Sequence, residues 1–275
     1  MNSTMKGAAM TVFVRGIGLL GPGLANWADA RAALRDPASW VSAPTVLNAP
    51  QLLPPAERRR AGTIVKLSLN VAEQACAAAG ASPGELATVF SASSGDPANC
   101  HALCEVLASA DRLVSPTRFT NSVHNASAGY WHIAVRSRAP STSLCGFDAS
   151  FGAGLLEAAL QCTNTQRPVL LVTGDVPYLE PLHGVRPLPD AFGLALLLDP
   201  AASAMPVPRL RIRIAPPGAA LTACDDARFE ALRRVIPAAR SLPMLQALAR
   251  EQTAEPVLDY LDGLALAVQV DLGAS

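Results

Sequence analysis

Two short, continuously apolar segments constrain the fold of this chain more than any other feature. Residues 168–174 (PVLLVTG) and 192–198 (FGLALLL) are too short for typical helices, and a charged residue closes each of them. Apolar runs of this length are typical of strands in the interior of a sheet. Helical patterns alternate with them along the chain, so the sequence predicts an α/β fold with a layered sheet that admits strands of either direction.

The remaining predicted elements follow the same alternation. Strands are predicted at residues 12–20, 88–91, 141–147, 209–214 and 263–270. Helices are predicted at residues 27–34, 60–79, 99–107, 125–135, 148–160, 226–239 and 242–250, and a proline-rich surface loop at 39–55. Because prolines cluster after residue 200, we expect a first domain over 10–200 and a divergent terminal subdomain over 201–275 that completes the sheet.

Composition narrows the possible partners and location. Half of the residues are hydrophobic, 16% are charged and the mean hydropathy is +0.26, which predicts a large core and a further buried face that meets another subunit. A net charge of zero without a basic run argues against nucleic acid. No apolar run reaches the roughly 18 residues of a membrane span, and the N-terminus lacks a secretory pattern. We therefore expect a cytoplasmic protein whose six scattered cysteines are reduced.

Several connected segments resemble the β-ketoacyl synthases. They are residues 12–34, 112–162, 168–174 and 190–200, with Pro116, Phe119, Asn121, Asn125, Ala128-Gly129 and Pro140 as the matching features. The resemblance covers roughly residues 10–200. It implies a thiolase-like α/β fold, namely the N-terminal half of a ketosynthase fold with a short divergent C-terminal extension. In particular, the chain resembles the short chain length factors of aryl polyene and xanthomonadin-type type II polyketide systems.

The same resemblance implies that the chain cannot condense acyl units by itself. The family's nucleophilic cysteine follows the strand-opening proline by eight residues, and that count from Pro140 reaches Asp148. A carboxylate is a weak nucleophile, whereas aspartate is a good N-cap, so we expect Asp148 to cap the next helix. An anion that repels or positions a malonyl group is the alternative role. The family's two catalytic histidines, in HGTGT-like and NSFG-like segments, have no counterpart, and the only histidine after Asp148 is His183.

Other reactive residues have simpler interpretations. Cys145 falls inside the predicted strand, where we expect it to be buried on the same face as Phe147, with a shifted nucleophile as the alternative. His124 and His132 share a helix face without a visible third ligand, and Cys100 and Cys104 lack the second ligand pair of a zinc site. Pro22 interrupts the glycine-rich turn that follows the first strand, which argues against a dinucleotide site. No metal or cofactor is therefore expected.

These observations predict a non-catalytic, chain-length-factor-like subunit. It would form a heterodimer with an active β-ketoacyl synthase, meet acyl carrier protein through that complex, and pair its strand at 141–147 with the equivalent strand of the synthase. The predicted interface and acyl-tunnel residues are Phe119, Asn121, His124, Cys145, Phe147, Asp148 and Phe151. Two alternatives stay open, a stand-alone acyl transferase that uses Cys145 and a homodimeric scaffold protein.

Overall fold

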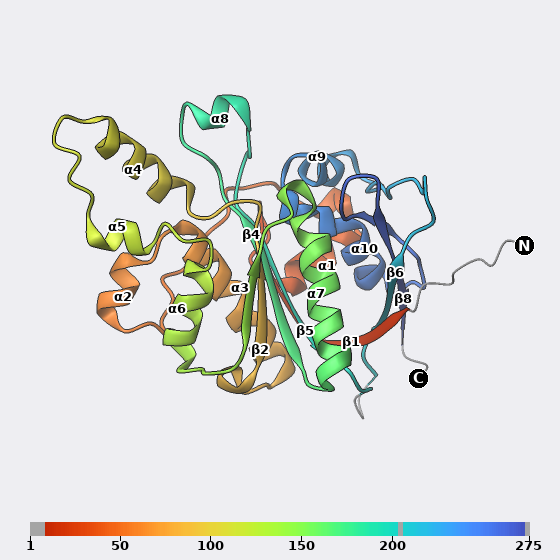
Figure 1. Ribbon diagram of the computed structural model, residues 1–275. Coiled ribbons are helices and arrows are strands. Elements are labelled where there is room, and N and C mark those ends of the chain that lie inside the picture. Colours follow the sequence, from red (N-terminus) through yellow and green to blue (C-terminus); the bar gives the residue numbers. More distant parts are fainter. Residues whose placement is uncertain (1–8, 203–205, 273–275) are drawn as a thin grey trace, which may run out of the picture.

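A single mixed sheet organises the chain (Figure 1). The computed structural model describes residues 9–202 and 206–272. The strands run in the order β3-β2-β4-β5-β1-β6-β8-β7. β2 pairs in parallel with β3 and β4, and the other pairings are antiparallel. The strands are β1 (Met10–Leu20), β2 (Ala87–Ser91), β3 (Ser141–Leu144), β4 (Val169–Asp175), β5 (Phe192–Asp199), β6 (Arg209–Ile214), β7 (Val257–Asp259) and β8 (Ala265–Asp271).

Helices cover both faces of this sheet, so the predicted α/β class is confirmed. The core divides into two clusters, one beneath α3 and α6 and the other beneath α1, α7 and α10. The α-helices are α1 (Trp27–Arg35), α2 (Pro55–Arg60), α3 (Thr63–Ala79), α4 (Pro97–Ala108), α5 (Pro116–Thr120), α6 (Ala126–Val135), α7 (Ser150–Thr165), α8 (Leu182–Val185), α9 (Ala227–Val235) and α10 (Leu242–Arg250).

The two apolar strands lie at the centre of the sheet, as their sequences predict. Successive side chains of a strand point to opposite faces. In β5, Leu194, Leu196 and Leu198 therefore enter the cluster under α7, whereas Ala195 and Leu197 enter the cluster under α3. Complete burial of one leucine side chain contributes about 2 kcal/mol to folding, so a strand that is buried on both faces is a strong organising element.

The predicted helix over 60–79 corresponds to α3, which begins three residues later, and Arg60 instead ends the separate helix α2. α3 starts at Thr63 after a Gly62 break. A Cβ on Gly62 would lie 1.7 Å from Oδ2 of Asp96, the residue whose carboxylate caps α4. The break therefore depends on a tertiary contact that the local pattern does not reveal. Farther along the chain, α9 ends at Val235 because Pro237 disfavours helical backbone at the residue before it, Ile236.

The segment after β3 also departs from its prediction. β3 ends at Leu144 instead of residue 147, and α7 begins at Ser150 instead of residue 148. Between them lie a bend and one 3-10 turn over Phe147–Ala149, with Phe147 in the left-handed region at φ +52°. This irregular turn becomes the centre of the candidate site.

The C-terminal part of the chain extends the same sheet. β6 pairs with β1, β8 pairs with β6, and β7, which was not predicted, pairs with β8. The division into domains at residue 200 stays a prediction, and residues 203–205 and 273–275 of the expected subdomain lie outside the described residues. Within the described ranges, no helix has the length and apolar character needed to cross a membrane.

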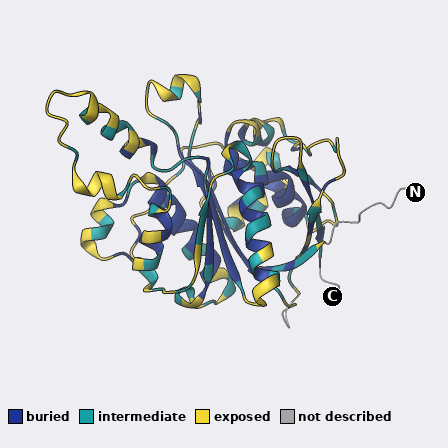
Figure 2. Cartoon of the chain, viewed as in Figure 1, coloured by how far each residue is buried: buried dark blue, intermediate teal, exposed yellow. Residues whose placement is uncertain are grey.

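α4, α5 and α8 project from the body of the molecule and are largely exposed (Figure 2). α4 buries only Pro97 and Asn99, and α5 and α8 contain no buried residue. This contrasts with β4, in which every residue is buried. The projecting helices therefore receive little support from the core.

Candidate functional site

The turn between β3 and α7 lies where the parallel strands β2, β3 and β4 have their carboxyl ends. Its backbone is held by Ser150, whose hydroxyl accepts a hydrogen bond from the Gly146 amide at 3.0 Å and donates one to the Phe147 carbonyl at 2.6 Å. Ser150 is completely buried, so this small network fixes the turn from below. The side chains of Phe147 and Asp148 are left facing outward.

Asp148 is held by two arginines from distant parts of the chain. Its Oδ1 accepts a hydrogen bond from Nη2 of Arg186 at 2.6 Å, and its Oδ2 accepts one from Nη2 of Arg240 at 3.0 Å. The prediction that Asp148 caps the following helix is wrong, because α7 begins after Ala149 without a side-chain cap. The carboxylate is instead hydrogen-bonded to the two guanidinium groups.

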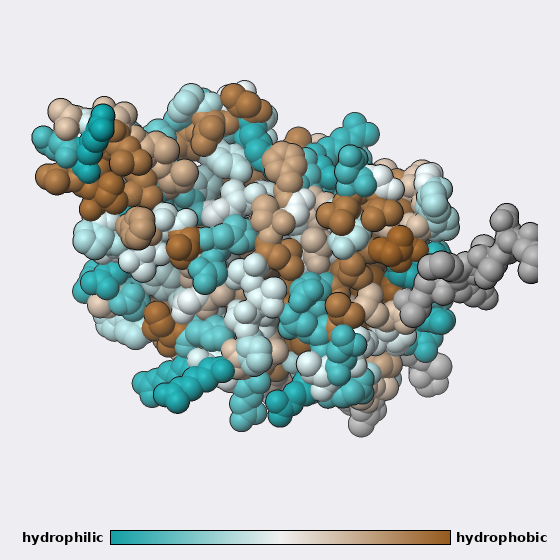
Figure 3. Space-filling model, viewed as in Figure 1, coloured by the Kyte–Doolittle hydropathy of each residue, from teal (hydrophilic) through white to brown (hydrophobic). Residues whose placement is uncertain are grey.

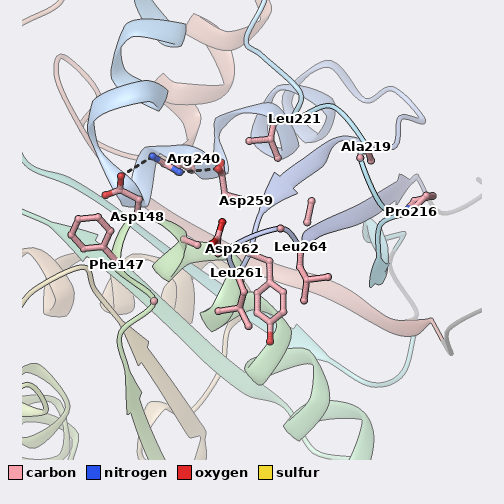
Figure 4. Close-up of a pocket in the computed structure, with 16 residues that line it drawn as sticks. Phe147, Asp148, Pro216, Ala219, Leu221, Arg240, Asp259, Leu261, Asp262 and Leu264 are labelled. Carbon is pink, nitrogen blue, oxygen red and sulfur yellow. Dashed lines mark hydrogen bonds and ion pairs between the residues drawn. The ribbon is translucent and has the colours of Figure 1, made fainter.

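The ion pair with Arg240 continues as a chain of alternating charges (Figure 4). Arg240 also donates to Asp259 Oδ1 at 2.8 Å, and Asp259 Oδ2 lies 3.8 Å from Nη1 of Arg233. Arg233 in turn forms two hydrogen bonds to Glu230, at 2.7 and 2.8 Å. The Arg233 hydrogen bonds lower the pKa of Glu230 to about 2. Asp148 is thus connected through paired charges to α9 and β7.

An open cavity of about 640 Å³ lies beside this chain of charges. Figure 4 shows Asp148, Arg240 and Asp259 at one end of it, with Leu221, Leu261 and Leu264 along the walls. β7 approaches α7 closely at this point, since a Cβ on Gly152 would lie 2.0 Å from the Asp259 carbonyl oxygen. Glycine at this position is what allows the C-terminal segment to pack beside the turn.

A second carboxylate, Asp175 at the end of β4, is completely buried beneath the turn. It accepts hydrogen bonds from the Ser93 amide at 2.9 Å, the Ser93 hydroxyl at 2.5 Å and the Ala238 amide at 2.8 Å. Burial raises the pKa of this carboxyl above its ordinary value, against the opposing effect of these bonds. Asp175 therefore fastens the loop after β2 to the 3-10 segment Pro237–Ser241.

Cys145 is exposed and lies one residue beyond β3, so the prediction of a buried strand residue is wrong. Its thiol donates to the Ser93 carbonyl at 3.4 Å and accepts from the Phe147 amide at 3.5 Å. His124 Nε2 lies 3.3 Å from the Ala92 carbonyl oxygen, within hydrogen-bond distance. In the described part of the chain, no histidine is hydrogen-bonded to this thiol.

The other predicted interface residues fall in different environments. Phe119 on α5 is 70% exposed, and Phe147 is 63% exposed. Asn121 accepts a hydrogen bond from the Tyr130 hydroxyl at 3.1 Å, which ties α5 to α6. Phe151 is buried in this chain's own core and does not reach the surface.

His124 lies in the turn before α6 and His132 on α6, so they do not share a helix face as predicted, but both line a cavity of about 580 Å³ beside β3. Its other lining residues are Asn125, Ala128, Gly129, Ser141 and Ser143. Cys100 and Cys104 are exposed on α4. No cluster of three or more potential metal ligands occurs among the residues that the structure describes.

Sequence reasoning missed four charged residues that build the site. They are Asp175, Arg186, Arg240 and Asp259. Arg186 and Arg240 lie 38 and 92 residues from Asp148, and no local spacing connects them. The sequence held one signal, namely Asp175, which directly follows the apolar run at 168–174. A carboxylate directly after a central strand lies at the sheet edge where sites form.

Comparison with known proteins identifies the class to which this fold and turn belong. Solved structures of the ketosynthase type share the fold, which confirms the predicted thiolase-like architecture. The family model described as "Beta-ketoacyl synthase, N-terminal domain" matches residues 26–254. The chain belongs to this family, as the sequence resemblance predicts.

Three solved structures illustrate the similarity. A structure from Xenorhabdus doucetiae, of the ketosynthase ApeO in complex with its chain length factor ApeC, aligns with a TM-score of 0.72 at 22% identity over 94% of this chain and 99% of its own. The ishigamide ketosynthase/chain length factor gives 0.69 at 16%, over 96% and 100%. A β-ketoacyl synthase from Burkholderia phymatum gives 0.67 at 14%, over 96% and 100%. At these identities the likeness establishes the fold. No curated protein sequence matches the chain.

Proposed function

We propose that this chain is the non-catalytic, chain-length-factor-like subunit of a heterodimer with an active β-ketoacyl synthase, and that it shapes the acyl tunnel of that synthase. The observation that carries the proposal is the ion-paired Asp148 at the strand-to-helix turn, the position that the family resemblance assigns to the nucleophilic cysteine. A carboxylate that is shared by two guanidinium groups is an acceptor of charge-assisted hydrogen bonds and a poor attacking group.

The surroundings of the turn support the same conclusion. Thiol nucleophiles in acyl transfer are activated by a paired histidine or a nearby cation. The Cys145 thiol instead donates a hydrogen bond to the Ser93 carbonyl. The only imidazole after the turn in the sequence, His183, lies on the exposed helix α8.

The exposed surface around β3 supports a large partner. β3 is the terminal strand of the sheet, with β2 on one side and no further strand on the other within the described residues. Apolar side chains are also exposed on and after α4 and α5, and Figure 3 shows apolar surface gathered over α4. They are Leu107, Leu113, Phe119 and Val123, and Phe147 is exposed in the turn that follows β3. A free strand edge with an exposed apolar side chain beyond its end fits addition of a strand from another subunit.

The similar structures support the identity of that partner. Two of them pair a ketosynthase with a chain length factor, and another is of a type II polyketide acyl-carrier protein in complex with its ketosynthase. We therefore propose an active synthase as the direct partner and an acyl carrier protein as a partner reached through the complex. From the sequence resemblance we also propose a cytoplasmic role in aryl polyene, type II polyketide or fatty-acid-like synthesis.

Co-expression with a β-ketoacyl synthase from the same genome tests the proposal. We expect one heterodimer in native mass spectrometry, no condensation of malonyl and acyl thioesters by this chain alone, and a changed product length when it is omitted. Phe119→Asp should weaken the complex. Ile214→Asp, at an exposed apolar residue on β6 beyond the centre of the sheet, is the control and should not. Separate elution of the two proteins with unchanged product length would refute the proposal.

An acyl transferase that uses Cys145 is the second candidate, favoured by the exposure of this thiol beside the turn. It requires transfer of an acyl group from a carrier thioester to the Cys145 sulfur, with the carrier thiol as the leaving group. Intact-mass measurement after incubation with acyl carrier thioesters decides between the two. We expect no added mass, and a stable adduct that Cys145→Ser abolishes would favour the transferase. A homodimer that persists in the presence of the synthase would favour a scaffold.

A further inference from the structure

The segment over residues 177–187 has a single polar connection to a distant part of the described chain. Its backbone hydrogen bonds are local, as from His183 to Leu179, and the last of them is accepted by Arg186 from the adjacent Leu188 amide. Among the described residues, the one hydrogen bond that joins it to a distant part of the chain is Arg186 to Asp148. The segment nevertheless exposes apolar side chains, with Val185 at 84%, and Figure 3 shows apolar surface over α8. An exposed apolar segment with one tether needs that tether to keep its position.

Arg186 also fixes the neighbouring aromatic ring. Its guanidinium carbon lies 4.1 Å from the centroid of the Phe147 ring, a cation–π arrangement. Phe147 is largely exposed and has left-handed backbone geometry. The ring therefore depends on Arg186 for its orientation, and Arg186 depends on Asp148.

Asp148 can hold Arg186, and with it the Phe147 ring, because its other carboxylate oxygen pairs with Arg240 in a firmly packed part of the molecule. Arg240 belongs to the 3-10 segment Pro237–Ser241, whose other four residues are buried. Asp175 secures the same segment through the Ala238 amide, and Arg240 is held from its other side by Asp259. Asp148 thus joins a firmly packed element to a weakly packed one.

We propose that Asp148 is a positioning residue, whose carboxylate holds Arg186, and through it segment 177–187 and the Phe147 ring, in the arrangement that the partner synthase binds. The inference rests on the proposed function for the identity of the partner. The tether itself is a property of the free chain. The residue at the former nucleophile position therefore acts in assembly, through the shape of the binding surface.

The energetics predict a local effect. The side chains of Asp148 and Arg186 are 38% and 23% exposed, and ion pairs of this exposure contribute little to global stability. Segments with few buried contacts open locally at low free-energy cost. Loss of the tether should therefore change the order of segment 177–187 much more than it changes the melting temperature.

Hydrogen–deuterium exchange on the free chain tests the tether. Asp148→Asn and Arg186→Gln should each speed amide exchange in residues 177–187 by about fivefold to tenfold, which corresponds to about 1 kcal/mol. Asp148→Glu should restore slower exchange. Asp271→Asn, which breaks the comparable Arg209 pair between β6 and β8, is the matched control and should leave this segment unchanged. Unchanged exchange in both tether variants would overturn the inference.

Affinity for the synthase tests the role of the tether in binding. We expect about tenfold weaker binding for each tether variant, and no further loss in the double variant, because both changes remove the same contact. If the wild-type chain does not bind the synthase, the proposed function fails, whereas the exchange result still decides the tether. If the wild-type chain binds and Asp148→Asn binds equally well despite faster exchange, the positioning role is refuted.

Discussion

The central strands and the projecting helices of this protein use similar residues for opposite purposes. β4 and β5 are rich in leucine, and these leucines are buried between two layers of helices. α4 and the stretch that leads into α5 also carry leucines, but Leu107 and Leu113 are exposed. The hydrophobic effect stabilises the fold in the first region and leaves apolar surface without a partner in the second. Apolar composition alone therefore does not distinguish a core from an interface.

The sharpest contrast is expected from truncation of a central leucine. Leu171 on β4 is completely buried in the cluster beneath α7. Leu171→Ala should lower the free energy of unfolding by about 2–5 kcal/mol, because it removes apolar contacts and leaves a cavity. Urea unfolding monitored by circular dichroism measures this change. A loss below about 1 kcal/mol would mean that the sheet is packed less tightly than the structure indicates.

The second-largest loss in the free energy of unfolding is expected at the buried carboxylate of Asp175. Asp175→Asn removes one carboxylate oxygen from the set that accepts from Ser93 and Ala238, with an expected loss of about 1–3 kcal/mol. Burial raises the pKa of Asp175, so in the window between its unfolded and folded pKa values the folded protein binds more protons. The free energy of unfolding should therefore fall as pH rises through that window. Unfolding at several pH values should show this slope in the wild type and lose it in Asp175→Asn.

Restoring a thiol at the turn should have a smaller effect on stability and none on condensation. Asp148→Cys leaves Arg186 and Arg240 without their carboxylate, at a cost of about 1 kcal/mol for a partly exposed pair. The two guanidinium groups should favour the thiolate and speed its alkylation relative to Cys145. Because we infer from the sequence resemblance that the two catalytic histidines of the family have no counterpart, we expect that the variant does not join acyl units. Condensation by Asp148→Cys alone would show that the rest of the catalytic site survives in this chain.

The smallest stability effect is expected at the projecting region. Leu113 is 81% exposed, and Leu113→Ala should change the free energy of unfolding by less than about 0.5 kcal/mol while it weakens synthase binding. Val41→Ala, at a residue of similar exposure in the loop after α1, is the control and should change neither property. Calorimetric titration with the synthase and thermal unfolding separate the two effects. Equal affinity for both variants would remove the region before α5 from the interface.

The central part of the fold follows from the sequence because its signals are local. The predicted strand at 209–214 coincides with β6, the prediction at 168–174 differs from β4 by one residue at each end, and the prediction at 192–198 differs from β5 by one residue at its C-terminal end. Continuous apolar runs specify burial without reference to the rest of the chain. Short elements such as α5, α8 and β7 were missed because three to five residues are too few to display a period.

The sequence predicted where a strand-to-helix turn lies but not the contacts that build it, and the role of this turn as a functional site stays a prediction. The family spacing from Pro140 leads to Asp148, and the turn lies there. The end of β3 at Leu144, the exposure of Cys145 and the pairing of Asp148 all depend on residues from other segments. Helix capping is the local preference of aspartate, and two arginines from outside the local sequence outcompete it.

The uncovered edge of β3 also has a consequence for how cells must make this protein. Open backbone donors and acceptors along a terminal strand recruit whatever chain is nearby, including another nascent copy. If the proposed heterodimer forms, this chain translated in excess of the synthase should precipitate or be degraded by proteases. Synthesis of the two polypeptides in equal numbers would then keep the four residues of β3 covered.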